Sequence, residues 1–373
     1  MAQGFGVTYD AAVIGGGVLG CATALHLARG GMRVALLERG GLCTQASGVN
    51  AGTLSMHHFR RLELVPYALR AWEMWKTASE WLGGGLEFGA QGGLVLAFNA
   101  REAELVKDKA VELKAAGSPV EVVDTAQARR IEPGLGPGVV LASHCPMDGH
   151  ANASLIGRVF RAALMAASVD VRQGREVTAL EHGSGGFEVR TTEGVVVARR
   201  VVLAGGVWLG RMADWFGLHA PVSYRVQQMA VSERMAPVMR TILGNVNGRL
   251  SLKQVDNGTV LIGGGWIGKG DPDHGGNEVI STSLVGNIRL ARYSIPALAR
   301  ARVVRVWLGL RDVYPDDRPI IGPLPGIDDA YIIGCGISGF TIGPYLGKLL
   351  AQRILGQEPE MALFDPTRVV TAR

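Results

Sequence analysis

The stretch DAAVIGGGVLG, residues 10–20, decides the first part of the fold. Its first five residues, 10–14, are typical of a short buried strand, and residues 21–29 favour a helix after the glycines. A second strand is expected at residues 33–37, and it ends on Glu38. This order of strand, glycine turn, helix and strand predicts a unit that binds a dinucleotide.

The spacing G-x-G-x-x-G assigns a task to each glycine of the turn. Gly15 permits the tight turn, Gly17 lets the backbone approach a pyrophosphate, and Gly20 lets the helix pack against the strand. The helix N-terminus offers free N–H groups and a positive dipole end to the phosphates. Glu38 lies where an acid binds the ribose hydroxyls of an adenosine. A glycine-rich turn without a ligand is the alternative interpretation.

Composition allows two domains or one large composite domain. The chain has 373 residues, of which 47% are hydrophobic and 19% charged, and its net charge is +5. The positive charges are scattered, with the densest pairs at residues 60–61, 129–130 and 199–200. This distribution indicates a solvated surface that can favour anionic substrates or an acidic partner, and we expect no nucleic-acid partner.

Cysteine usage and hydropathy indicate a protein of a reducing compartment. Cys21, Cys43, Cys145 and Cys335 form no C-x-x-C pair, so we expect neither a disulfide framework nor a metal or iron–sulfur site in this chain. We expect no signal peptide and no membrane span, because no apolar run reaches the roughly 18 residues required. A cytoplasmic location follows as an expectation.

The order of expected elements indicates that the nucleotide-binding part is interrupted twice. Strand-rich segments intervene, and apolar strands that end in glycines return at residues 200–206 and 330–334. We therefore expect one domain assembled from residues 1–82, 146–218 and 303–373, with a β-rich substrate domain built from residues 83–145 and 219–302. Helices are expected at residues 62–82, 102–116, 152–167, 281–293 and 343–355, with a cap at Asp124 and a hairpin turn at residues 256–258.

Several of these segments resemble a known family. Residues 10–38, 47–52, 200–208, 307–311, 318–322 and 334–344 are similar to the FAD-dependent D-amino-acid oxidase superfamily, in the expected order over nearly the whole chain. The most similar branch contains glycine oxidase, monomeric sarcosine oxidase, and the β subunits of heteromeric sarcosine, proline, hydroxyproline and opine dehydrogenases. The resemblance implies an α/β fold in which a Rossmann-like FAD domain carries an inserted β-rich substrate domain.

A second glycine motif, residues 334–339, formally repeats the first. Residues 356–359 follow its helix and do not resemble a strand that ends in an acid, so the motif fails as a second dinucleotide unit. The resemblance implies instead that this loop and helix N-terminus face the flavin pyrimidine and stabilise negative charge there. A tight connection with glycines for packing is the alternative.

The resemblance also implies the residues that bind non-covalent FAD. Gly309 stands where monomeric sarcosine oxidase carries its flavin-linking cysteine, and Cys335 lies off that position. The implied cofactor-binding residues are Gly15, Gly17, Val18, Leu19, Gly20, Glu38, Arg39, Ser47, Asn50, Ala51, Gly52, Thr53, Val177, Ala204, Gly205, Gly206, Trp208, Gly336, Ile337, Ser338, Gly339, Phe340 and Thr341.

Arg311 is the candidate catalytic residue. It ends an apolar strand, where a buried charge is costly unless a partner compensates it. Residues 307–311 match the family's Trp-x-Gly-Leu-Arg segment, whose arginine holds the substrate carboxylate in glycine oxidase. An arginine fork binds a carboxylate through two hydrogen bonds. A salt bridge to Asp312, Asp316 or Asp317 is the alternative, and Asp312 departs from the proline that the family often has there.

Candidates for the substrate pocket come from the insert and from the segment after the flavin loop, residues 47–52, which the resemblance places along the FAD pyrophosphate and flavin. Tyr224, Gln227 and Trp266, with Arg225 beside them, belong to the part expected to cover the flavin, and each also fits an ordinary core or surface position. His57 and His58 follow the flavin loop and also suit the surface. His150 is interpreted as a turn residue.

The predicted function is oxidation of the C–N bond of a small amino acid or secondary amine. Glycine, sarcosine, proline, hydroxyproline and opines are candidates; hydride passes to flavin N5 and the resulting imine hydrolyses. Electrons go to oxygen or to a partner subunit, so a hetero-oligomer is possible. The alternatives are oxidation of a 2-hydroxy acid or glycerol phosphate, a non-catalytic FAD-binding subunit, and an NAD-dependent dehydrogenase. A phosphate substrate calls for several convergent basic residues, and only Arg311 is clearly placed from sequence.

Overall fold

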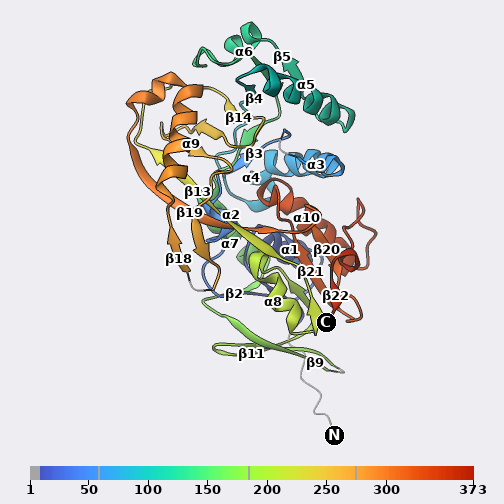
Figure 1. The fold of residues 1–373 in the computed structure, drawn as a ribbon. Coiled ribbons are helices and arrows are strands. Elements are labelled where there is room, and N and C mark those ends of the chain that lie inside the picture. Colours follow the sequence, from blue (N-terminus) through green and yellow to red (C-terminus); the bar gives the residue numbers. More distant parts are fainter. Residues whose placement is uncertain (1–8, 58, 184, 274) are drawn as a thin grey trace.

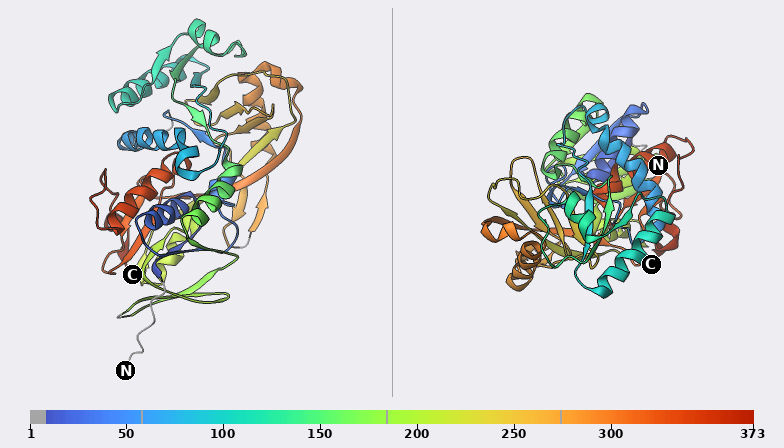
Figure 2. Two further views of the ribbon diagram at one scale, coloured as in Figure 1. Left: turned by 180° about the vertical axis from the view of Figure 1, so that it is seen from behind. Right: turned by 90° about the horizontal axis from the view of Figure 1, so that it is seen from above.

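The computed structural model describes residues 9–57, 59–183, 185–273 and 275–373, so His58 lies outside the described residues. Two large sheets dominate the fold, and they occupy opposite ends of the molecule (Figures 1 and 2). The α/β architecture with a Rossmann-like part and a second, β-rich part is confirmed.

The first sheet is centred on β1 (Tyr9–Ile14), which pairs in parallel with β2 (Val34–Glu38) and β11 (Gly194–Leu203). Three distant parts of the chain contribute strands to this sheet. Its order is β20-β21-β11-β1-β2-β8, with β20 (Ile320–Pro323), β21 (Ala330–Gly334) and β8 (Asp170–Gln173), and β9 (Val177–Gly183) and β10 (Gly186–Thr191) extend β11 as antiparallel strands.

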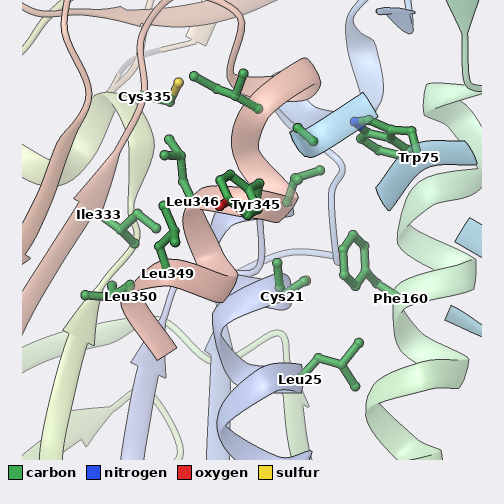
Figure 3. Close-up of a cluster of buried hydrophobic side chains, with 14 of the residues drawn as sticks. Cys21, Leu25, Trp75, Phe160, Ile333, Cys335, Tyr345, Leu346, Leu349 and Leu350 are labelled. Atoms are coloured by element: carbon green, nitrogen blue, oxygen red, sulfur yellow. The ribbon is translucent and has the colours of Figure 1, made fainter. Parts of the chain in front are cut away.

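Both faces of this sheet are buried because its central strands are apolar without interruption. In β1, Ala11 and Val13 contact the helical side, whereas Ala12 and Ile14 contact the side formed by β9, β10 and α8 (Leu209–Asp214). Figure 3 shows the helical side, where side chains of the covering helices pack together. These helices are α1 (Val18–Arg29), α3 (Val65–Lys76), α7 (Ala153–Ala166) and α10 (Gly339–Ile354).

Helices α1 and α10 approach each other closely through glycine. A Cβ atom placed on Gly347 would lie 2.7 Å from the Cβ of Ala22 and 2.9 Å from the backbone nitrogen of Thr23, so any larger residue would push the helices apart. Helix α10 begins at Gly339, earlier than the predicted residue 343. No parallel strand follows it in the described chain, which confirms that its glycine motif does not open a second dinucleotide unit.

The second sheet is antiparallel except for one parallel pair, β14 with β4. Asp124 and Gln127 form the predicted helix cap as a reciprocal capping box, and a hairpin joins β15 to β16 at the predicted turn. The order is β19 (Val303–Val313), β13 (Ser223–Ser232), β16 (Val260–Gly263), β15 (Ser251–Gln254), β14 (Ile242–Asn245), β4 (Gly93–Ala97), β6 (Leu141–Cys145) and β5 (Glu121–Val123). Helices α5 (Ala100–Ala115), α6 (Thr125–Ile131) and α9 (Ser281–Ser294) accompany it.

Strand β19 differs from the predicted organisation. The sequence places residues 303–313 in the FAD domain, whereas the structure pairs β19 along its length with β13 in the second sheet. The long ladder β13–β19 reaches from the second sheet toward the first (Figure 1). The division into domains otherwise stays a prediction.

Short elements complete the described chain. The predicted helix at residues 62–82 is divided at Thr77, whose hydroxyl donates a hydrogen bond back to the carbonyl of Glu73. The short elements are α2 (Ala46–Val49), β3 (Thr53–Leu54), η1 (Leu62–Leu64), α4 (Ala78–Leu82), β7 (Gly149–His150), η2 (Gly206–Trp208), β12 (Leu218–His219), β17 (Lys269–Asp271), β18 (Gly275–Glu278), η3 (Pro296–Arg300), η4 (Pro366–Arg368) and β22 (Thr371–Ala372).

Candidate active site

A cavity of about 730 Å³ lies between the carboxyl ends of the parallel strands and the β13–β19 ladder. Ile14, Leu37 and Ala204 line it from the first sheet, and Gln227 and Gly309 line it from the second. Ligands of open α/β sheets bind at the carboxyl ends of the strands, because loops and helix N-termini converge there. The cavity is therefore the candidate site.

The β1–α1 turn fits tightly between its neighbours. Gly15 has a φ of +112°, and a Cβ there would lie 2.4 Å from the carbonyl oxygen of Ala204. A Cβ on Gly20 would lie 2.0 Å from the carbonyl oxygen of Gly15, so both positions require glycine. The N–H of Val18 donates to the Ser47 hydroxyl at 3.0 Å, which connects the loop of residues 47–52 to the start of α1.

Glu38 is held at the edge of the cavity at the end of β2. Its carboxylate accepts hydrogen bonds from the backbone N–H of Gly16 at 2.7 Å and of Gly40 at 2.8 Å. The guanidinium of Arg39 stacks on Trp208, with its carbon 3.8 Å from the ring centroid. This end of the cavity combines an oriented carboxylate with a flat cationic–aromatic wall.

The loop before β3 forms another wall of the cavity. The side chain of Asn50 makes its hydrogen bonds within this loop. The Asn50 amide donates to the carbonyls of Ala46 and Ser47 at 2.9 and 2.8 Å, and its oxygen accepts from the N–H of Gly52 at 2.6 Å. Asn50 thus shapes the loop. Every predicted cofactor-binding residue lines the cavity except Gly20 and Gly52, which lie behind the wall and fix its backbone.

The start of α10 opens onto the same cavity from the other side. Gly336 and Ser338 adopt left-handed backbone conformations, with φ of +66° and +62°, and they turn the chain from β21 into the helix. The residues from Cys335 to Thr341 line the cavity. The first N–H groups of α10 are free of intrahelical partners, so this end can stabilise an anionic edge of a ligand.

Arg311 lies on the wall formed by β19. The residue is half-buried, and its Nε atom is buried without a hydrogen-bond partner among the described residues. Burial lowers the pKa of this guanidinium from its ordinary value, and the neighbouring Arg225 lowers it further. A buried donor without a partner is costly, and a ligand anion would satisfy it.

The alternative of a salt bridge does not hold for Arg311. The Asp312 carboxylate accepts from the Tyr314 hydroxyl at 2.7 Å and from the Gly336 N–H at 3.1 Å. Asp316 pairs with Arg368 at 2.7 Å, and Asp317 with Arg60 at 3.7 Å. Within the described chain, no carboxylate forms an ion pair with Arg311.

The structure brings to the cavity wall further arginines that sequence analysis did not count as pocket residues, although it placed Arg225 in the part that covers the flavin. Arg60, Arg225 and Arg249 line the cavity together with Arg311. Arg225 lies directly opposite Arg311 in the β13–β19 ladder. Sequence separation hides the pairing of Arg225 with Arg311, because only the antiparallel register of β13 and β19 brings them together.

Only one of the four predicted pocket residues reaches the cavity. Gln227 lines it, whereas Tyr224 is 40% exposed and its hydroxyl lies 3.4 Å from the Asp271 carboxylate. Strand alternation explains the difference, because residues of opposite parity on β13 face opposite sides. Trp266 is also outside the cavity wall: its indole N–H donates to the Arg249 carbonyl at 2.7 Å, and its ring lines a separate surface hollow.

His57 is buried behind the wall rather than facing the cavity. Its Nδ1 atom lies 2.7 Å from Asp148, which also accepts from the Met56 N–H at 2.6 Å and the Ser55 hydroxyl at 3.0 Å. This network holds the segment after β3. His150 belongs to β7, where its ring contacts Gln91 at 3.1 Å, so the turn interpretation is replaced by a short strand.

Lys253 is a further residue that sequence analysis missed. Its side chain is buried on β15, and its ammonium donates to the Thr53 hydroxyl at 3.1 Å, directly behind the cavity wall. Burial lowers the pKa of Lys253 to about 7. No sequence signal marks it, because lysine is ordinarily exposed.

Lys253→Met is expected to raise the free energy of unfolding by roughly 2–4 kcal/mol at pH 7. The unfolded chain binds the lysine proton up to about its ordinary pKa of 10.5, whereas the folded protein releases it near 7. The penalty is therefore full below pH 7 and fades as the pH rises toward 10.5. Urea unfolding at pH 7 and pH 9.5, with exposed Lys114→Met as control, measures it. A loss of stability at pH 7, or a pH-independent difference, contradicts the expectation.

One cavity is lined by the glycine turn after β1, by the Glu38 carboxylate and by the N-terminus of α10. This combination is typical of a flavoprotein that binds a dinucleotide. The residues fit FAD, because the β1–α1 turn, the Glu38 carboxylate and the start of α10 all line this same cavity. Over residues 10–353 the sequence matches the family described as DAO, FAD dependent oxidoreductase. The chain belongs to this family and is an FAD-dependent oxidoreductase.

Relatives and a solved structure agree with this assignment over nearly the full length. An opine oxidase subunit from Agrobacterium tumefaciens (strain Ach5) is 29% identical, covering 96% of this chain and 97% of its own length. The beta subunit of sarcosine oxidase from an Arthrobacter species is 29% identical, covering 94% and 88%. The structure of glycine oxidase from Geobacillus kaustophilus matches with a TM-score of 0.88 and 25% identity, covering 96% and 98%.

Among the described residues, no helix is both long enough and apolar enough to cross a bilayer.

Proposed function

We propose that the chain oxidises the C–N bond of a small amino acid or secondary amine, of the glycine, sarcosine, proline, hydroxyproline or opine type. The observation that carries this proposal is Arg311, whose buried Nε has no partner among the described residues on the wall of the FAD cavity. The names of the relatives, which include glycine, sarcosine and opine oxidases, support it.

Bound FAD supplies a two-electron acceptor at N5, so that the C–H hydride leaves the substrate while the nitrogen lone pair forms an imine, which water hydrolyses. Arg311 binds the substrate carboxylate through two hydrogen bonds and thereby orients the C–H bond. The positive charges of Arg311 and Arg225 disfavour an ammonium ion beside them, so the substrate binds as the free amine, with its proton lost to bulk water, and keeps its lone pair.

The electrons then leave to oxygen or to a partner subunit. Two of the relatives are named as subunits, which supports a hetero-oligomer for this chain. The four cysteines, Cys21, Cys43, Cys145 and Cys335, are buried and free, so any iron–sulfur relay would lie on another chain.

Anaerobic mixing of the FAD-loaded protein with a panel of amino acids, secondary amines and 2-hydroxy acids tests the proposal. We expect an amino acid or secondary amine to bleach the flavin absorbance, and this readout does not depend on the electron acceptor. Bleaching by 2-hydroxy acids alone would replace amine oxidation with alcohol oxidation. No bleaching by any compound of the panel would favour a non-catalytic FAD-binding subunit.

A further inference from the structure

The wall of the cavity on the β13–β19 ladder carries two arginines side by side. Arg225 and Arg311 are direct cross-strand partners, and Gln227 and Gly309 form the next cavity-facing pair. Side chains of directly opposed residues leave the same face of a sheet, with Cβ atoms about 4.5–5.5 Å apart. Both guanidinium groups can therefore reach one ligand.

Exposure changes in order along this wall. Met229 is buried, Gln227 is half-buried and Arg225 is exposed, so the cavity deepens from Arg225 toward Met229. Arg311 is half-buried opposite Arg225. Arg311 is therefore the inner cation and Arg225 the outer cation of a pair at the mouth of the site.

Among the described residues no carboxylate forms an ion pair with either arginine, although Asp312 and Asp317 lie near enough to raise the pKa of Arg311 and partly offset its lowering. Like charges placed opposite each other are unfavourable, and the lowered pKa of Arg311 reflects both its burial and Arg225. The acids near Arg311 are engaged elsewhere: Asp312 by Tyr314 and Gly336, and Asp317 by Arg60. Within the same described ranges, neither Arg225 nor Arg311 forms an ion pair, so two negative charges on a ligand would balance two unpaired cations.

A ligand with a single carboxylate would pair with only one of the two arginines. The inner guanidinium suffices to bind one carboxylate in bidentate form. The outer guanidinium belongs to an exposed residue on the same cavity wall, so it is available to a second anionic group of a ligand that Arg311 binds.

We propose that the substrate is a secondary amine with two carboxylates, one on each side of the nitrogen, with Arg311 binding the inner carboxylate and Arg225 the outer one. This inference rests on the proposed amine oxidation and names its substrate class. Arg225 is then the residue that selects N-carboxyalkyl amino acids over N-alkyl amino acids.

Two thioether analogues that lack the oxidisable amine test the assignment by binding alone. (Methylthio)acetate carries one carboxylate and thiodiacetate carries two, and each can be titrated into the FAD-loaded protein by the change in flavin absorbance. We expect thiodiacetate to bind at least about tenfold more tightly, since a charge-assisted hydrogen bond contributes on that scale. In Arg225→Met the two Kd values should agree within about twofold.

Variants with matched chemistry control this experiment. Arg199→Met removes an exposed arginine from β11, outside the cavity, and should keep the wild-type ratio of Kd values. Arg225→Lys keeps the charge without the fork and should give an intermediate ratio. A wild-type ratio below about twofold, or a ratio that survives in FAD-loaded Arg225→Met, overturns the proposal.

Substrate assays separate failure of this inference from failure of the proposed function. Sarcosine and iminodiacetate differ in the same second carboxylate, and their anaerobic flavin reduction gives a Kd for each. A Kd at least about tenfold lower for iminodiacetate supports the inference. Equal Kd values would overturn the second-carboxylate site while amine oxidation stands. Reduction by 2-hydroxy acids alone would overturn both.

Discussion

Arg311→Ala is expected to lower the second-order rate constant of anaerobic flavin reduction by about 30-fold to 5,000-fold, while FAD stays bound. Removing one partner of a buried, hydrogen-bonded charge pair costs roughly 2–5 kcal/mol. The loss arises because the carboxylate loses its bidentate anchor and the reacting C–H bond is no longer held in place. Stopped-flow absorbance with a substrate found by the amine panel measures the constant.

The matched control for this variant is Arg199→Ala, which removes an exposed arginine of β11 and should leave the rate constant within about twofold. The FAD content of each variant is measured from the flavin spectrum, since loss of cofactor would also lower the rate. A rate constant for FAD-loaded Arg311→Ala within about threefold of wild type contradicts the role of Arg311.

Gly15→Ala is expected to abolish FAD binding and to lower the free energy of unfolding by roughly 2–5 kcal/mol. An alanine at a φ of +112° is strained, and its methyl group would lie 2.4 Å from the Ala204 carbonyl oxygen. The chain must then shift β1 away from β11 at the point where the pyrophosphate is expected to lie. Flavin content after reconstitution and thermal unfolding measure the two effects.

Gly85→Ala provides the control, because Gly85 has no positive φ and a Cβ there meets nothing within 4 Å. It should retain both FAD and stability. A Gly15→Ala protein that takes up FAD with wild-type affinity would show that the cofactor does not depend on this turn.

Local sequence signals predicted the parts of the fold that depend on local chemistry. The glycine crook follows from positive φ and close approach at Gly15, and the helix start at Asp124 follows from its capping box. The failure of the second glycine motif as a dinucleotide unit followed from the residues after its helix. These features need no knowledge of distant contacts.

The features that the sequence did not predict depend on how distant strands pair with one another. Arg225 and Arg311 lie side by side only because β13 and β19 pair in one register, and this pairing also moves β19 into the second sheet. Tyr224 and Gln227 are three residues apart on β13, so strand alternation places them on opposite faces. The burial of Lys253 left no local signal, because it arises from packing of β15 against the cavity wall.

A crystal structure of the FAD-loaded protein with (methylthio)acetate tests the central claim most directly. We predict the isoalloxazine between the start of α10 and the β13–β19 ladder, with the ligand carboxylate within hydrogen-bonding distance of the Arg311 guanidinium. FAD bound outside this cavity, or a carboxylate held by other groups while Arg311 turns away, would contradict the account.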